Sequence, residues 1–213
     1  LSIPDDYLPR TNYLPDCSLD EYRSRTPKVS WIDKGYTTYK CVTEYYRVIA
    51  SRALSVSGER TLQGAIQAKG SSHIDGIFSV VPKDLTLVPV IAALWASLPL
   101  DFFVKTTGKS DLREELARTL ALPRSLYGLN RVICRVLVIN CLTSHYAELW
   151  NNCWSAQFNE QSWSINPDSN HPGANVLPQD FFKKLTPEWQ RDCALRTDYA
   201  RRQALVEIDV LVA

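Results

Sequence analysis

The residues best suited to chemistry in this chain form a short polar stretch between two apolar helical patterns. Lysine neutralises phosphate charge, hydroxyls and amides donate hydrogen bonds to it, and glycine lets the backbone approach closely. A following helix that opens at Ser110 or Asp111 would add amide donors. The stretch predicts a phosphate-binding loop, and an ordinary polar loop between helices is the alternative. Its residues are Lys105, Thr106, Thr107, Gly108, Lys109, Ser110 and Arg113.

A second basic region covers residues 23–69, with nine lysines and arginines against three aspartates and glutamates. A basic block beside a neutral remainder is typical of a surface that binds a polyanion. We therefore expect residues 23–69 and 105–113 to share one positive face; a solvated surface without a binding role is the alternative. In this region we expect Arg47, Arg60 and Lys69 to contact the polyanion. We expect the same of His73, which follows the region.

The sequence lacks the motifs of self-sufficient catalysis. It has no G-x-G turn, no Walker loop, no G-x-S-x-G elbow and no H-E-x-x-H pair. Six cysteines form no C-x-x-C pair and the three histidines are isolated, so we expect free thiols and no metal site. We therefore predict no catalytic, cofactor-binding or metal-binding residue in this chain.

Composition and periodicity predict an α+β fold, a mixed α/β half followed by an all-helical half. With 45% apolar and 22% charged residues the chain is globular, and it has no apolar run long enough for a membrane span. The helical pattern at the end stops without a terminating residue, which predicts a part of a longer polypeptide. The predicted parts are a connector (1–27), an α/β domain (28–125) and a helical part (126–213) truncated at 213.

Local signals predict most of the elements within these parts. A capping box at Ser18 predicts a helix through Arg25, and Thr186-Pro187-Glu188 predicts another helix start. Residues 31–40 have a β-like pattern broken by Gly35. The further predicted helices are 42–54, 85–98, 111–120, 129–154 and 197–213, and the predicted strands are 60–68 and 74–81.

Two long segments carry a resemblance to a known family. Ala92 to Pro123 has a helix that ends near Leu-Pro-Leu-Asp-Phe, a polar loop with glycine, and a Leu-Pro finish. This stretch resembles the target-recognition region of large DNA adenine methyltransferases. They include type IIG restriction–modification enzymes and the methylases of BREX and DISARM phage-defence systems. Thr186 to Ala213 is similar to the C-terminal helical segment of the same methylases.

The resemblance implies a DNA-binding fragment of a prokaryotic, cytoplasmic protein. Its partners would be double-stranded DNA, its own N-terminal methyltransferase domain and other subunits of a defence system, with no membrane involved. S-adenosylmethionine would bind in the catalytic domain, because the Asn-Pro-Pro-Tyr motif of adenine methylation is absent here. Asn166-Pro167, the only Asn-Pro, continues as Asp168-Ser169. The alternative function is a helical module that docks partner subunits and has little DNA contact.

Overall fold

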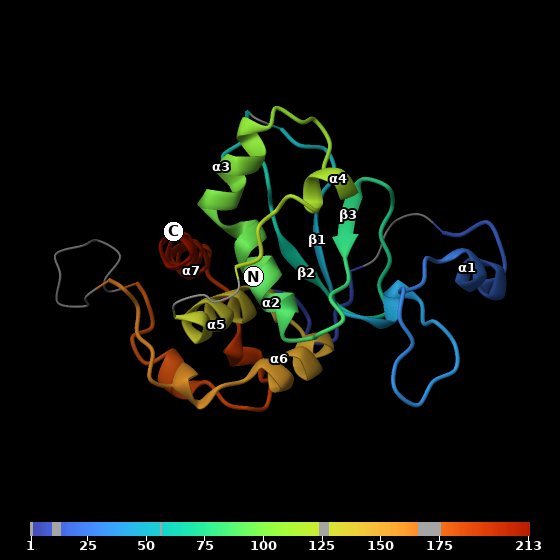
Figure 1. The fold of residues 1–213 in the computed structure, drawn as a ribbon. Coiled ribbons are helices and arrows are strands. Elements are labelled where there is room, and N and C mark those ends of the chain that lie inside the picture. The colour runs from blue at the N-terminus through green and yellow to red at the C-terminus, as the bar shows by residue number, and fades with distance from the viewer. Residues whose placement is uncertain (1, 10–13, 56, 124–127, 166–175) are drawn as a thin grey trace.

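A small antiparallel sheet forms one layer of the molecule (Figure 1). The computed structural model describes residues 2–9, 14–55, 57–123, 128–165 and 176–213. The sheet has the order β2-β1-β3, so the first strand in the chain is the central one. Val48 pairs with Ile66 on one side and with Val80 on the other. The strands are β1 (Arg47–Ser51), β2 (Ala65–Gln67) and β3 (Ile77–Val80).

Helix α2 (Leu87–Ala96) joins the sheet to the rest of the core. It packs against β1 and β2 and also against α5 (Leu129–Asn140) and α7 (Asp198–Val212), which pack on each other. Buried apolar side chains from β1 through α2 to α7 belong to one hydrophobic cluster. The predicted parts 28–125 and 126–213 therefore contribute to a single core.

Shorter helices complete the fold. Helix α3 (Leu98–Thr106) follows α2 directly, and among the described residues no single helix is long and apolar enough to span a membrane. Helices α2 and α3 are long and apolar enough only when they are counted as one, and they are bent by 61° relative to each other. The other α-helices are α1 (Leu19–Arg25), α4 (Glu114–Ala117) and α6 (Ala147–Cys153). The 3₁₀ helices are Val42–Glu44, Ser144–Tyr146, Ala156–Phe158, Phe182–Lys184 and Arg191–Cys193.

The structure confirms the α+β class and the elements that have strong local signals. The Ser18 hydroxyl accepts from the Glu21 amide and starts α1, and Thr197 caps α7 in the same way. Asp84 accepts from the amide and hydroxyl of Thr86 just before α2. Strands β2 and β3 lie within the predicted ranges 60–68 and 74–81, and all six cysteines are free.

The helix predicted over 42–54 is wrong, because this segment contains the central strand β1. Tyr46, Val48 and Ala50, at every second position, belong to the core cluster and are at most 3% exposed. Such a short strand contains too few residues to separate a period of two from a helical period. The β-like prediction for 31–40 is also wrong, since that segment is an irregular loop.

The helix predicted over 129–154 is interrupted at residues 141–143. The chain turns there, and α6 begins only at Ala147. The helix start predicted at Thr186 is not formed, because its hydroxyl donates to the Glu188 carbonyl (2.6 Å) instead of accepting from an amide. Tertiary contacts hold this segment in an irregular path, among them the bond from the Trp150 indole to the Thr186 carbonyl (2.9 Å).

A close backbone approach between the segment before β2 and helix α2 requires glycine at position 64. A Cβ atom on Gly64 would lie 2.6 Å from the Trp95 Cβ and 3.2 Å from the Ala92 carbonyl oxygen. We expect Gly64→Ala to lower the free energy of unfolding by about 1–3 kcal/mol, because backbone must move to relieve the overlap. Urea denaturation followed by circular dichroism measures the loss.

Gly76→Ala is the matched control for this prediction. A Cβ at Gly76 would have no atom within 4 Å, so that variant should remain within about 0.5 kcal/mol of the wild type. Equal stability of the two variants would contradict the close approach at Gly64.

Candidate nucleic-acid interface

The predicted phosphate-binding loop leaves the end of α3 and is anchored on both sides by buried leucine and valine. Val104 is 1% exposed and Leu112 is fully buried, whereas Thr106 to Ser110 are exposed and Lys105 is half-buried. Gly108 has a φ of +64°, a conformation that glycine adopts without strain. Two fixed ends and a left-handed glycine hold the loop away from the core.

The two threonine hydroxyls of this loop donate back to the end of α3. Thr106 donates to the Phe103 carbonyl and Thr107 to the Val104 carbonyl, both at 2.7 Å. The Lys109 amide donates to the Thr107 hydroxyl at 3.3 Å. The threonines therefore stabilise the end of α3, and the lysine side chains carry the positive charge of the loop.

The segment after the loop pairs with the chain that follows β1. The Leu54 amide donates to the Ser110 carbonyl (2.8 Å), and the Leu112 amide donates to the Arg52 carbonyl (2.7 Å). The helix predicted over 111–120 is reduced to α4, which begins at Glu114. Amides at the loop therefore serve this pairing, and the predicted helix start at Ser110 or Asp111 is not formed.

The charges around the loop are mixed. Lys105 and Lys109 have no ion-pair partner among the described residues. Asp111 lies between two arginines, 3.8 Å from the Arg52 Nε and 3.6 Å from the Arg113 guanidinium. Arg113 keeps 65% of its side chain exposed. The two lysines and Arg113 thus remain accessible to an anion.

Arg47 lies in the interior and cannot contact DNA in this conformation. It is 1% exposed, and its guanidinium donates to the Ser71 carbonyl. Burial lowers the pKa of Arg47, since no carboxylate offsets the loss of solvent. We expected Arg47 to contact a polyanion from a helix over 42–54, but its position at the start of the central strand buries it.

The other predicted contacts are paired within the protein. Arg60 forms a two-pronged ion pair with Asp209 of α7 (2.7 and 3.1 Å), which raises the pKa of Arg60. The Lys69 ammonium lies 2.6 Å from the Glu148 carboxylate on α6. The ring nitrogens of His73 hydrogen-bond to the Ser79 hydroxyl and the Ile74 carbonyl. Arg60 and Lys69 link distant segments, whereas the two bonds of His73 stay within the segment that leads into and includes β3.

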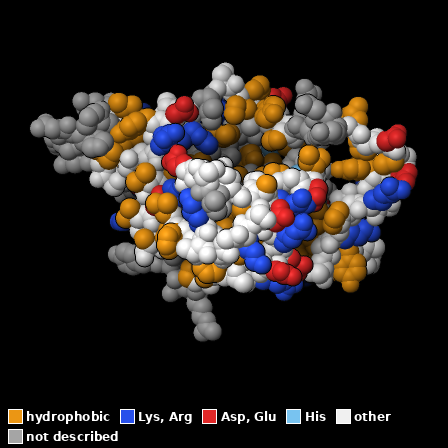
Figure 2. Space-filling model, turned by 90° about the horizontal axis from the view of Figure 1, so that it is seen from above, with side chains coloured by type: hydrophobic (Ala, Val, Ile, Leu, Met, Phe, Trp, Pro, Cys, Tyr) orange, Lys and Arg blue, Asp and Glu red, His pale blue; other side chains and the backbone are white. Residues whose placement is uncertain are grey.

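The single positive face predicted for residues 23–69 and 105–113 is not formed as predicted. Arg47 is buried and Arg60 is turned toward α7, whereas Lys109 is exposed beyond α3. On the face that Figure 2 shows, basic side chains lie beside acidic ones and apolar side chains lie between them. The structure brings together only the residues from Lys105 to Arg113.

A residue without a predicted role fixes the helix that carries the loop. Asp101, in the Leu-Pro-Leu-Asp-Phe segment, is 3% exposed, and its carboxylate accepts from the amides of Thr61 and Leu62 at 2.6 Å. It ties α3 to the segment before β2. An acid between apolar residues on a helix was the available sequence signal.

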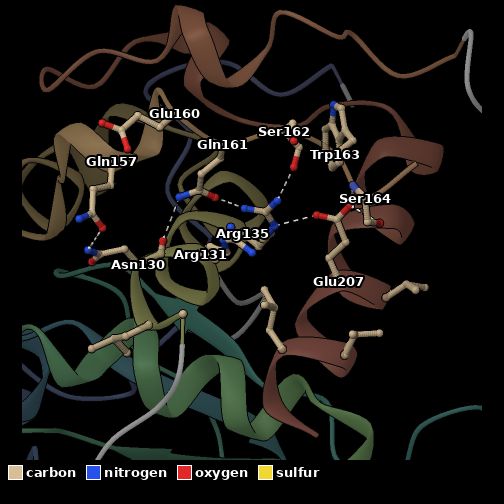
Figure 3. Close-up of a pocket in the computed structure, with 15 residues that line it drawn as sticks. Asn130, Arg131, Arg135, Gln157, Glu160, Gln161, Ser162, Trp163, Ser164 and Glu207 are labelled. Atoms are coloured by element: carbon tan, nitrogen blue, oxygen red, sulfur yellow. Dashed lines mark hydrogen bonds and ion pairs between the residues drawn. The ribbon is translucent and has the colours of Figure 1, made fainter. Parts of the chain in front are cut away.

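A hollow of about 690 Å³ lies between α5, α7 and residues 157–164 (Figure 3). Its charged centre is the ion pair of Arg135 and Glu207 (2.7 Å), in which both side chains are 5% exposed. Arg135 also donates to the side-chain amide oxygen of Gln161 and to the backbone carbonyl of Ser162, and Glu207 accepts from the Ser164 amide and hydroxyl. Because these groups satisfy one another, the pair is structural.

Comparison with known proteins assigns the chain to no family. No family model matches the chain, and no curated protein or solved structure is significantly similar to it. The described ranges also contain no group of three or more His, Cys, Asp or Glu side chains arranged to hold a metal ion.

The buried pair gives a stability prediction. Glu207→Ala leaves Arg135 charged and unpaired in the interior, so we expect a loss of about 3–5 kcal/mol in the free energy of unfolding. Urea denaturation measures it. Glu114→Ala is the control, because that carboxylate pairs with Arg118 at the surface and should contribute less than about 0.5 kcal/mol. Similar losses in the two variants would contradict a structural role for the buried pair.

The same pair predicts a pH dependence. Burial alone would raise the pKa of Glu207, but the charge of Arg135 and the Ser164 amide outweigh it and lower this pKa below the ordinary 4.5. A lowered carboxylate pKa stabilises the fold fully above the unfolded value, and that stabilisation disappears as the pH falls through the folded value. As the pH falls below about 5, we expect the free energy of unfolding to decrease more for the wild type than for Glu207→Gln. Parallel pH profiles of the two proteins would contradict this.

Proposed function

We propose that this chain is the DNA-binding, target-recognition part of an S-adenosylmethionine-dependent DNA adenine methyltransferase. The observation that carries the proposal is the loop from Lys105 to Ser110. Two lysines without a described acidic partner stand on a loop whose ends are fixed in the core. A positively charged, positioned loop is suited to the phosphate backbone, which supplies much of the affinity for DNA.

The loop would position DNA and would not read its bases. Lysine contacts to phosphate carry no sequence information, and the two threonine hydroxyls of the loop already donate to carbonyls of α3. Recognition of a base sequence would depend on further side chains of the whole enzyme. Methyl transfer from S-adenosylmethionine to a flipped adenine belongs, in this proposal, to a separate N-terminal catalytic domain of a prokaryotic restriction or phage-defence system.

A second candidate function is the docking of a partner subunit of a defence complex. The observation that favours it is an exposed apolar surface on α3 and α7. Phe102 is 69% and Val210 73% exposed, and Leu98 and Val206 are about half exposed. The Leu98 amide donates to Asp209, which places the start of α3 against α7. Exposed apolar side chains that gather on neighbouring helices are typical of protein contacts.

The lysine loop is tested by replacing Lys105 and Lys109 together with alanine. We expect weaker binding to two duplexes of unrelated sequence by a similar factor, because phosphate contacts do not discriminate between bases. If each lysine contacts one phosphate, the log–log salt dependence should become less steep by about 2 in total. Fluorescence anisotropy titrations over a series of salt concentrations measure both quantities.

Lys183→Ala with Lys184→Ala is the matched control, since it removes two exposed lysines from a different surface. This control should lose less affinity and keep the wild-type salt slope. A wild-type slope in the loop variant would assign the loop a structural role. If instead the chain binds a partner subunit, and replacing Phe102 and Val210 weakens that binding, the docking function is favoured.

A further inference from the structure

Residues 28–41, here called the aromatic loop, form a closed excursion between α1 and β1. The Val29 amide donates to the Lys40 carbonyl (3.0 Å) and the Val42 amide to the Pro27 carbonyl (2.9 Å), so the two ends lie side by side. In Figure 1 the loop extends, in light blue, away from the sheet and the helices that cover it. A compact loop with joined ends is an Ω-loop, a type that frequently carries function.

A single carboxylate organises the interior of the aromatic loop. Asp33 accepts from the Tyr45 hydroxyl (2.7 Å) and the Trp31 indole (3.1 Å), and the Lys40 ammonium lies 3.1 Å from it. Buried Val29 anchors the loop below, at 6% exposure. The loop therefore has its own polar centre and keeps its shape without a hydrophobic core.

The outer surface of the aromatic loop presents two tyrosines to solvent. Tyr36 is 56% and Tyr39 52% exposed. The Lys40 ammonium lies 3.6 Å from the centre of the Tyr36 ring, which holds that ring in place from one face. Gly35, at a φ of +87°, makes the turn just before Tyr36. A ring held in this way, as that of Tyr36 is, loses little freedom when a ligand covers it.

The charge beside these rings indicates the ligand. Residues 23–41 contain five basic residues and one acid, and that acid is Asp33, already paired inside the loop. The basic side chains of Arg23, Lys28 and Lys34 are exposed. A surface with aromatic rings and positive charge fits a polyanion that has flat faces. In duplex DNA neighbouring base pairs cover those faces, whereas unpaired bases are free to stack.

We propose that the aromatic loop binds single-stranded nucleic acid, with Tyr36 and Tyr39 stacking on unpaired bases and Lys28 and Lys34 contacting the phosphates between them. This site is separate from the lysine loop and goes beyond the duplex contact proposed above. It would suit a protein that works on DNA whose strands are locally opened. A protein partner is the other class of ligand for such a loop, and the test distinguishes it.

The test uses the 213-residue chain and a fluorescent oligothymidine of 20 nucleotides. We expect Tyr36→Ala with Tyr39→Ala to weaken binding to the oligothymidine by about tenfold or more, because two stacked bases lose their support. Tyr36→Phe with Tyr39→Phe should bind as the wild type, since phenylalanine keeps the stacking ring. Tyr7→Ala, which removes an exposed tyrosine elsewhere, should also bind as the wild type.

Duplex binding separates this inference from the proposed function. The tyrosine variant should keep its affinity for duplex DNA, and Lys105→Ala with Lys109→Ala should lose duplex affinity while retaining its affinity for oligothymidine. Unchanged oligothymidine binding by the Tyr→Ala variant, or an equal loss in the Tyr→Phe variant, would overturn the proposal. A wild-type chain that binds no oligothymidine would overturn it too and leave the loop as a contact for protein.

Discussion

The fold depends on two carboxylates of α7 that must be paired because they lie on the buried side of this helix. Glu207 is 5% and Asp209 8% exposed. Glu207 pairs with Arg135 of α5, and Asp209 pairs with Arg60 and accepts from the Leu98 amide at the start of α3. An unpaired buried charge costs several kcal/mol, so each carboxylate fixes the position of its partner element. Helix α7 thereby holds Arg60, the start of α3 and Arg135 of α5 in place.

This internal pairing decides which basic residues remain for a ligand. Arg60 and Lys69 belong to ion pairs that link distant segments, and Arg47 is enclosed at the start of the central strand. Two loops, the lysine loop after α3 and the aromatic loop before β1, are among the places where accessible positive charge remains. Both are fixed at their ends, the first by Val104 and Leu112 and the second by backbone hydrogen bonds. Rigid ends of this kind position a side chain for binding at a small cost in entropy.

The exposed position of the lysine loop followed from its local sequence, since polar residues with glycine between apolar runs seldom lie in a core. The predictions that Arg47, Arg60 and Lys69 contact DNA rested on the positive charge of their segment alone. Net charge along a segment does not show whether an arginine has a carboxylate nearby in space. Asp209 and Glu148 are 149 and 79 positions away from the residues that they pair with. Asp101 was passed over for the same reason, because its amide partners are at positions 61 and 62.

The sequence by itself determined the elements whose signals act within a few residues. A hydroxyl cap and a sustained apolar stripe suffice for α1 and α7, and the α+β class follows from the mixture of such patterns. Only the tertiary structure decided that residues 47–51 form the central strand and that Thr186 does not start a helix. A strand needs partners, and β1 obtains them from β2 and β3, up to about 30 residues away. Such pairings, like the ion pairs of α7, form only when the whole chain is packed.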